Sequence, residues 1–177
     1  MTETTTNIHR VTINAPIETV WNTLVKTDEA LPFFFGSVCE TSDGLKPGAR
    51  YRMVSANRKV AMVVGDVLRF EPPHVYAHTF TMTNIDEPPV TVTYTLSEKD
   101  GGTEFELRID DLVPGSKLAK EMVSSQGFIA GNLKALCETG RPAFTGRMVG
   151  LLGPVFARLA KKSQAVEHWP LVGRDKM

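Results

Sequence analysis

The chain has 177 residues, which corresponds to one domain with a sizeable hydrophobic core. Its 20 Lys and Arg residues balance 20 Asp and Glu residues, so it lacks the basic excess typical of nucleic-acid binding, and no nucleic-acid partner is expected. The two cysteines are far apart and form no CxxC pair, and the polar N-terminus resembles no signal peptide, so we expect a cytoplasmic location.

The N-terminal part of the chain predicts three short elements after a polar lead. Residues 1–7 are rich in threonine and are expected to form this disordered lead. Alternating apolar residues predict a strand over residues 8–13. A helix is predicted over residues 16–25, because its opening proline suits a first helical turn. A second short helix is predicted over residues 28–36, with Asp28 as its cap and a glycine at its end.

The middle of the chain predicts a run of strands separated by turns rich in proline, glycine and aspartate. The candidate strands are Ser37–Thr41, Ala49–Ser55, Lys59–Phe70, Val75–Thr83, Val90–Glu98 and Thr103–Asp110. The Asp-Gly-Gly sequence at residues 100–102 is a hairpin signal between the last two. Short turns between consecutive strands predict an antiparallel meander rather than βαβ units.

A long amphipathic helix is predicted from Ser116, its N-cap, to the C-cap glycine Gly140. Gly127 and Gly131 share one side, where they would allow close approach to a sheet or a ligand. A long amphipathic helix needs an apolar surface to cover, so the chain predicts a single α+β domain of the helix-grip type over residues 8–140. The apolar residues of the helix that fall on one face are Leu118, Met122, Ile129, Leu133 and Leu136.

Residues 141–177 are expected to form a C-terminal amphipathic extension. Apolar and basic residues predict a helix over residues 146–162, interrupted at Gly153-Pro154. The favoured interpretation is that this helix packs over the domain or across a dimer. The second interpretation is that it docks on a partner protein. Peripheral membrane contact, which a basic amphipathic helix suits, ranks last and is not expected.

Three short motifs occur in order along the predicted domain. Ile13–Trp21 reads I-x-A-P-x-x-x-V-W, Gly65–Pro73 is a strand that ends in a double proline, and Asn132–Leu136 closes the long helix. Together they resemble the SRPBCC (START-like) superfamily, and within it the subgroup named after the activator of the heat-shock-protein-90 ATPase. The resemblance spans residues 8–142. It implies the helix-grip fold of the birch pollen allergen, in which a curved antiparallel β-sheet wraps around a long C-terminal helix.

The resemblance implies a hydrophobic cavity beneath the long helix but no single chemistry, since members include lipid carriers, polyketide cyclases and cochaperone domains. We therefore expect the protein to bind a small hydrophobic molecule, or to have a cochaperone-like role with a chaperone or homodimer partner. No cofactor is expected. Tyr94 and Gln126 would be the polar groups of an otherwise apolar pocket, and strand alternation pairs Met62 with Val64 on one face. The candidate cavity residues are Phe33, Phe35, Met53, Met62, Val64, Tyr94, Met122, Gln126 and Ile129.

Catalysis is the alternative interpretation. A cyclase, dehydratase or hydrolase acting on a hydrophobic substrate would need an acid or base inside the cavity, for which Asp66, His78 and Tyr94 are distant candidates. No catalytic residue is assigned, and no metal site is expected because the spacing of His74 and His78 supplies only two ligands. A third interpretation is a protein-interaction module whose cavity is filled by side chains.

Overall fold

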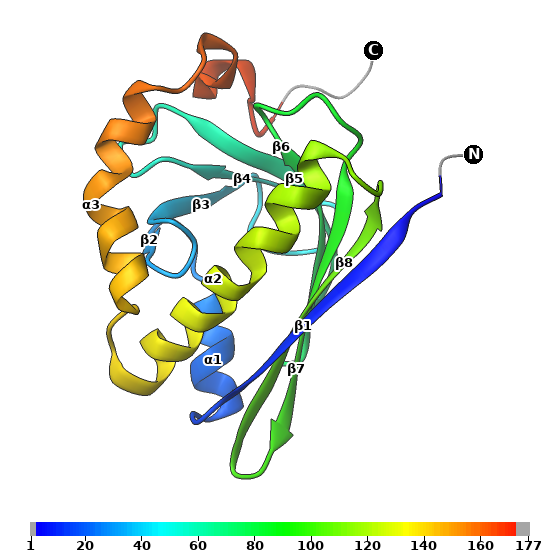
Figure 1. Ribbon diagram of the computed structural model, residues 1–177, viewed down its shortest axis with the longest axis vertical. Helices are drawn as coiled ribbons and strands as arrows, with labels where there is room; N and C mark the ends of the chain where they lie inside the picture. Colours follow the sequence, from blue (N-terminus) through cyan, green and yellow to red (C-terminus); the bar gives the residue numbers. More distant parts are fainter. Residues whose placement is uncertain (1–2, 173–177) are drawn as a thin grey trace.

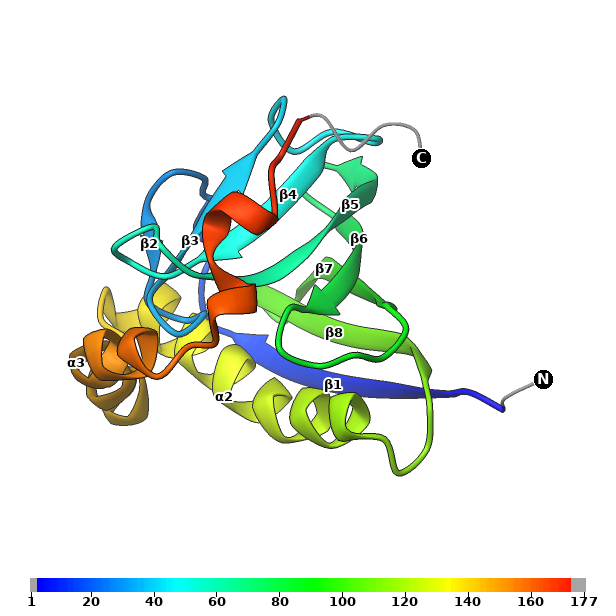
Figure 2. The ribbon, with the colours of Figure 1, turned by 90° about the horizontal axis from the view of Figure 1, so that it is seen from above.

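The computed structural model describes residues 3–172 of the chain. An antiparallel sheet of eight strands, in the order β1-β8-β7-β6-β5-β4-β3-β2, curves around the long helix α2 (Figures 1 and 2). The strands are β1 (Thr5–Ile13), β2 (Ala30–Leu31), β3 (Ser37–Thr41), β4 (Arg50–Val54), β5 (Ala61–Glu71), β6 (Val75–Met82), β7 (Val90–Lys99) and β8 (Gly102–Leu112). The helices are α1 (Ile17–Leu24), α2 (Lys117–Thr139), α3 (Phe144–Arg158) and the 3₁₀ turns Lys162–Gln164 and Val166–His168. The predicted helix-grip class is confirmed.

The core lies between the concave face of the sheet and the helices α1 and α2. In β7 every second residue from Val90 to Leu96 is buried, because successive side chains of a strand point to opposite faces. Tyr94 of β7 is paired with Leu107 of β8, so the buried residues of adjacent strands form one continuous apolar surface. This surface is what the apolar side of α2 covers.

Both ends of α2 are capped as predicted. The Ser116 hydroxyl accepts a hydrogen bond from the N–H three residues on at 3.0 Å, and Gly140 closes the helix in the left-handed conformation with φ of 72°. The structure adds a second cap, because the Glu87 carboxylate accepts the N–H groups of Lys117 and Leu118, each at 3.0 Å. The negative carboxylate also interacts favourably with the positive end of the helix dipole.

The prediction of a close approach at Gly127 and Gly131 is wrong. Both glycines are exposed, and a Cβ atom added at either one would meet no other group within 4 Å. They therefore face away from the sheet. The close approach occurs instead at Gly65 in β5, where a Cβ atom would overlap the carbonyl of Thr79 and the ring of Tyr51.

The short helix predicted over residues 28–36 is also wrong. Residues 30–31 form β2, which pairs with the start of β3, and a tight turn joins the two strands. The Leu31 carbonyl accepts hydrogen bonds from the N–H groups of Phe34 and Gly36, both at 3.0 Å. Asp28 has φ of 61°, which is not the extended backbone of an N-cap. Pairing with β3 satisfies the backbone here, so the segment needs no helix.

The two ends of the chain differ from the predicted boundaries. β1 begins at Thr5, because its residues pair with β8 as far as Leu112, so the described part of the predicted lead is largely a strand. Residues 1–2 of that lead and residues 173–177 of the extension lie outside the described residues. The predicted interruption in the extension is wrong, since α3 continues through Pro154. The carbonyl that Pro154 leaves free belongs to Gly150, which is exposed and accessible to water.

None of the described helices is long and apolar enough to cross a membrane.

Candidate functional site

A cavity of about 150 Å³ lies between the sheet and α2. We call it the α2 cavity. The helix side is lined by Glu121, Met122, Ser125, Gln126 and Ile129. The sheet side and the turn before β3 contribute Phe34, Phe35, Met62, Val63, Phe80, Met82, Val92, Tyr94, Leu107 and Ile109. The walls are therefore apolar, with a few polar groups on the helix side.

Gln126 is the polar group buried most deeply on the helix side of the α2 cavity. Its position, four residues after Met122 and three before Ile129, places it on the apolar face of α2. The side chain is only 4% exposed, and its Nε2 atom has no hydrogen-bond partner among the described residues. A buried amide N–H without an acceptor is costly, so a hydrogen-bond acceptor beside Gln126 would stabilise the folded protein.

An aromatic pair lies beside the α2 cavity. Phe35, in the turn between β2 and β3, stacks on Phe128 of α2 with ring centroids 4.6 Å apart and the planes 6° from parallel. Phe35 has φ of 56°, an unfavourable conformation for a residue with a Cβ atom, and its side chain is partly exposed. The exposed carboxylate of Glu121 lies at the cavity margin. The stack connects the turn to the helix beside the cavity.

A second, smaller cavity of about 30 Å³ lies between the end of α1 and the sheet, and it shares the walls Phe34, Phe80 and Tyr94 with the α2 cavity. It contains a buried polar pair, in which the Tyr51 hydroxyl lies 2.8 Å from His78 Nδ1. The Tyr51 hydroxyl donates to the Thr79 carbonyl at 2.8 Å, so His78 Nδ1–H is the donor to the Tyr51 oxygen.

Burial dominates the titration of this polar pair. It lowers the pKa of His78 to about 4, so the imidazole is neutral at pH 7. It also raises the pKa of the Tyr51 phenol well above its ordinary value. The Cys39 thiol in the same cavity has its pKa raised to about 12, again mainly by burial, and is not a reactive thiolate.

The candidate residues from the sequence fall into three groups. The α2 cavity is lined by six of them, Phe35, Met62, Tyr94, Met122, Gln126 and Ile129. The smaller cavity is lined by Phe33 and Met53, and also by Tyr94. Val64 lies outside both.

The prediction that Val64 lines the cavity together with Met62 is wrong. Val63 is the β5 residue that points inward, so Val64 lies on the outer face, in a groove with Arg52 and Thr81. A register irregularity between β4 and β5 next to Met62 is what lets that flexible side chain reach the cavity although its strand parity is that of Val64.

Several lining residues were not among the sequence candidates, although a periodic signal existed for them. Phe80 and Met82 follow His78 at every second position of β6. Leu107 and Ile109 are likewise two positions apart in β8. Alternation along a strand is the signal that would have grouped these residues within each strand. It left open which face was concave, and that choice depends on the curvature of the sheet.

Of the acid and base candidates, His78 and Tyr94 lie together, with ring centroids 5.5 Å apart, whereas Asp66 lies elsewhere. Asp66 is exposed on the outer face of the sheet, where its carboxylate lies 3.7 Å from Arg50. His78 is in the smaller cavity, and Tyr94 is a wall between the two cavities.

Comparisons with known proteins identify the same fold. The sequence model of the family described as Activator of Hsp90 ATPase homolog 1-like protein matches residues 14–138. No curated protein sequence matches the chain. The solution structure of the Aha1 dimer from Colwellia psychrerythraea is similar with a TM-score of 0.61 and 14% identity, covering 77% of this chain and 98% of that one.

Two further structures support the assignment of the fold. Protein MLL2253 from Mesorhizobium loti has a TM-score of 0.61 and 19% identity, covering 75% of this chain and 96% of that one. Ara h 8.0201 has a TM-score of 0.54 and 18% identity, with coverage of 72% and 94%. These likenesses concern the fold, whereas the sequence match covers most of the chain, and so the protein belongs to the family of Activator of Hsp90 ATPase homolog 1-like proteins.

Proposed function

We propose that this protein binds a small apolar molecule that carries one hydrogen-bond acceptor, in the α2 cavity. The observation that carries the proposal is the unpartnered Nε2 of Gln126, buried in an apolar wall. An apolar ligand alone would leave this donor unsatisfied. A ligand with a carbonyl, ether or hydroxyl oxygen would accept its hydrogen bond while burying apolar surface.

The size of the cavity limits the ligand. An apolar cavity of about 150 Å³ accommodates a molecule of roughly the size of benzene. Three methionines, Met62, Met82 and Met122, line it. Methionine side chains are flexible, so rearrangement of these three would admit a larger molecule without a change in the backbone.

Binding is favoured over catalysis because the buried pair of His78 and Tyr51 lies in the smaller cavity and not in the wall of the α2 cavity. His78 and Tyr51 hydrogen-bond to each other in the smaller cavity, which has room for about one water molecule. Phe80 and Tyr94 stand between this pair and the space a ligand would occupy. The carboxylate that lines the ligand space is that of Glu121, an exposed residue at the margin of the cavity.

The experiment compares two molecules of nearly the same shape. Acetophenone has a carbonyl oxygen where α-methylstyrene has a methylene group. We expect the protein to bind acetophenone about fivefold more tightly, because one neutral hydrogen bond contributes about 1 kcal/mol. Binding is measured by NMR titration of the ¹⁵N-labelled protein, with shifts expected at residues that line the cavity.

The variant Gln126→Met keeps the volume of the side chain but removes the donor. It should abolish or reverse the preference for acetophenone while leaving α-methylstyrene bound. Ser124→Ala, an exposed change on the same helix, serves as the matched control and should keep the preference. Equal binding of the two molecules by the unchanged protein would refute the role of Gln126, and no binding of either would refute the proposal.

A cochaperone-like role is the second candidate, supported by membership of the family. The similar Aha1 structure is a dimer, so self-association belongs to the same hypothesis. Stimulation of the ATPase of an Hsp90-type chaperone, measured with and without this protein, tests the first part. Sedimentation velocity tests the second. This role uses the surface of the domain, so Gln126→Met should leave it unchanged.

A further inference from the structure

The helix α3 carries its large apolar side chains on the side that faces away from the protein. Gly146 is its buried residue, and Val149, Gly153 and Ala157 are partly buried on the same side. A helix that covered a core would have the opposite arrangement, with large residues inward. The exposed residues are Phe144, Met148, Leu151, Leu152, Val155, Phe156 and Leu159.

These side chains form one continuous stripe. At 3.6 residues per turn, the seven positions fall within an arc of about 140° around the helix axis. Arg147 and Arg158 are also exposed and lie along one edge of the same arc. Leu151 and Leu159 are 81% and 75% exposed, so little of the domain covers the stripe.

The orientation of the helix is set by contacts at its two ends. At the N-terminal end, Gly146 packs so closely on the buried Asn132 of α2 that a Cβ atom would overlap the Asn132 amide. At the C-terminal end, residues 162–169 are bound to the turn between β4 and β5 and to the outer face of the sheet. The main chain of Val166 donates to the Lys59 carbonyl at 3.0 Å, and Val166 and Trp169 pack on Val38, Val54 and Ala61.

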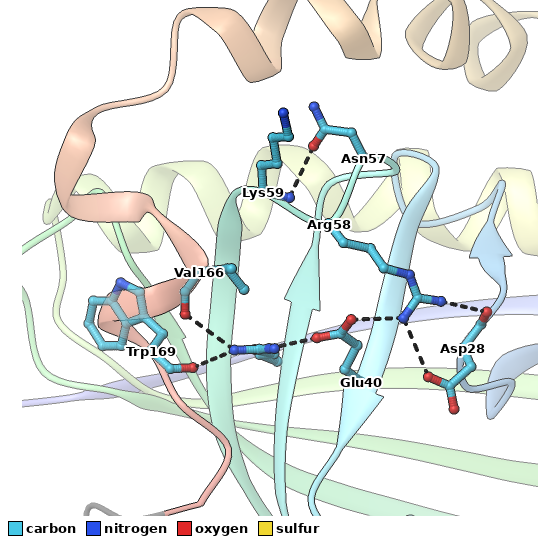
Figure 3. A network of polar contacts seen from close by, with 8 residues as sticks. Asp28, Glu40, Asn57, Arg58, Lys59, Val166 and Trp169 are labelled. Carbon is cyan, nitrogen blue, oxygen red and sulfur yellow. Dashed lines mark hydrogen bonds and ion pairs between the residues drawn. The ribbon is translucent and has the colours of Figure 1, made fainter.

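An arginine network fastens this C-terminal segment (Figure 3). The Arg52 guanidinium donates to the carbonyls of Val166 and Trp169 at 3.2 and 2.9 Å, and to Glu40 at 2.7 Å. Glu40 also accepts from Arg58 at 2.8 Å. Because both ends of α3 are held, its apolar stripe is directed outward by the fold.

The charge of this region is one-sided. Residues 139–166 contain no Asp or Glu and five cations, Arg141, Arg147, Arg158, Lys161 and Lys162. The other 149 residues therefore hold 15 Lys and Arg against 20 Asp and Glu, an excess of five negative charges. Near a negatively charged surface, such a molecule turns its α3 side toward that surface and the rest away.

We propose that α3 is a docking helix for an anionic lipid bilayer, lying in the membrane interface with its apolar stripe in the acyl region and its cations among the headgroups. An exposed apolar stripe edged by Arg and Lys is the composition of an interfacial helix. A second copy of the chain fits less well, because its residues 139–166 bring five further cations and no carboxylate to pair with them. The proposal is independent of what the α2 cavity binds. The sequence alone ranked membrane contact last among the interpretations of residues 141–177, whereas this proposal ranks it first.

The experiment is co-sedimentation of the full chain with vesicles of phosphatidylcholine, with and without phosphatidylserine. We expect the protein to partition at least about tenfold more onto the vesicles that contain phosphatidylserine, and to be released as salt is raised. Leu151→Asp should reduce the partitioning about tenfold or more. Leu68→Asp is the matched control, since Leu68 is an exposed leucine on β5, and it should partition as the unchanged chain does.

A charge reversal completes the design. Arg147→Glu combined with Arg158→Glu should remove the preference for phosphatidylserine, whereas Lys120→Glu on α2 should not. Thermal unfolding verifies that each variant is folded. Absence of vesicle binding, equal binding to both vesicle types, or binding unaffected by Leu151→Asp would each overturn the proposal. A dimer in sedimentation velocity that Leu151→Asp dissociates, without vesicle binding, would assign the stripe to a second copy instead.

Discussion

Helices α2 and α3 are both amphipathic, yet they present their apolar sides in opposite directions. In α2 the large residues, such as Leu133 and Ile129, are buried against the sheet. In α3 the large residues, such as Leu151 and Phe156, are exposed, and glycine and alanine face the protein. Helical periodicity indicates that a helix has two faces, but what covers the apolar one depends on the rest of the fold. The variants below test this contrast.

The largest difference in stability is expected between equivalent leucine-to-alanine changes in the two helices. Leu133→Ala removes a side chain with 0% exposure from the core and should lower the free energy of unfolding by about 3 kcal/mol. Leu151→Ala should change it by less than about 0.5 kcal/mol, because the side chain is exposed. Urea unfolding of both variants provides the measurement. Similar losses in the two variants would mean that the α3 stripe is packed on the domain.

The second effect concerns the polar pair beneath the α2 cavity. His78 has a folded pKa of about 4, below the ordinary value of 6.5, so the unfolded chain takes up this proton first as the pH falls. The stabilisation that the neutral, buried His78 gives the folded state is therefore fully present above about pH 6.5. It is lost between about pH 6.5 and 4, which lowers the free energy of unfolding by about 3 kcal/mol.

Unfolding curves across this pH range measure the effect. His78→Gln should remove most of the slope above about pH 4.5, where carboxylates with lowered pKa values such as Glu87 stay ionised. His74→Gln is the control, because His74 is exposed, and it should retain the slope. A slope that survives in His78→Gln would assign the proton uptake to another group.

The third effect tests what directs α3 outward. Arg52→Ala removes the hydrogen bonds to the carbonyls of Val166 and Trp169, and should cost about 1–3 kcal/mol because these groups are partly buried. Residues 159–169 should then exchange their amide hydrogens faster, while α2 stays protected. Arg50→Ala, at a more exposed ion pair with Asp66, should leave the exchange of this segment unchanged. Unaltered exchange in Arg52→Ala would show that the 3₁₀ turns hold the segment without this network.

The smallest effect separates two glycines of α3. Gly150→Ala should raise the free energy of unfolding by about 0.5–1 kcal/mol, since a Cβ atom there meets nothing within 4 Å and the unfolded chain loses freedom. Gly146→Ala should instead lower it by about 1–2 kcal/mol, because the methyl group overlaps the buried Asn132. Thermal unfolding compares the two. A gain in both variants would indicate that α3 does not pack closely on α2.

The sequence could predict which residues share an apolar face, but not which of these faces lines the cavity. The apolar face of α2 and the polar exception Gln126 follow from helical spacing, and both are in the cavity wall. Val64 was misplaced because alternation distinguishes two faces without saying which one is concave. The helix predicted over residues 28–36 is wrong because three consecutive phenylalanines and a glycine fit a helix end as well as a tight turn. Pairing of β2 with β3 decides between the two.

The sequence by itself determined the strand order of the meander, the length and caps of α2, and the family, because these depend on local patterns of apolar residues, turns and capping side chains. Only the tertiary structure decided where those patterns point. It places Gln126 in an apolar wall, where Nε2 has no partner among the residues that the structure describes. Contacts between residues more than a hundred positions apart, such as Arg52 with Val166 and Trp169, turn the α3 stripe outward. Long-range contacts of this kind leave no periodic signal in the chain, which is why the direction of α3 could not be inferred from it.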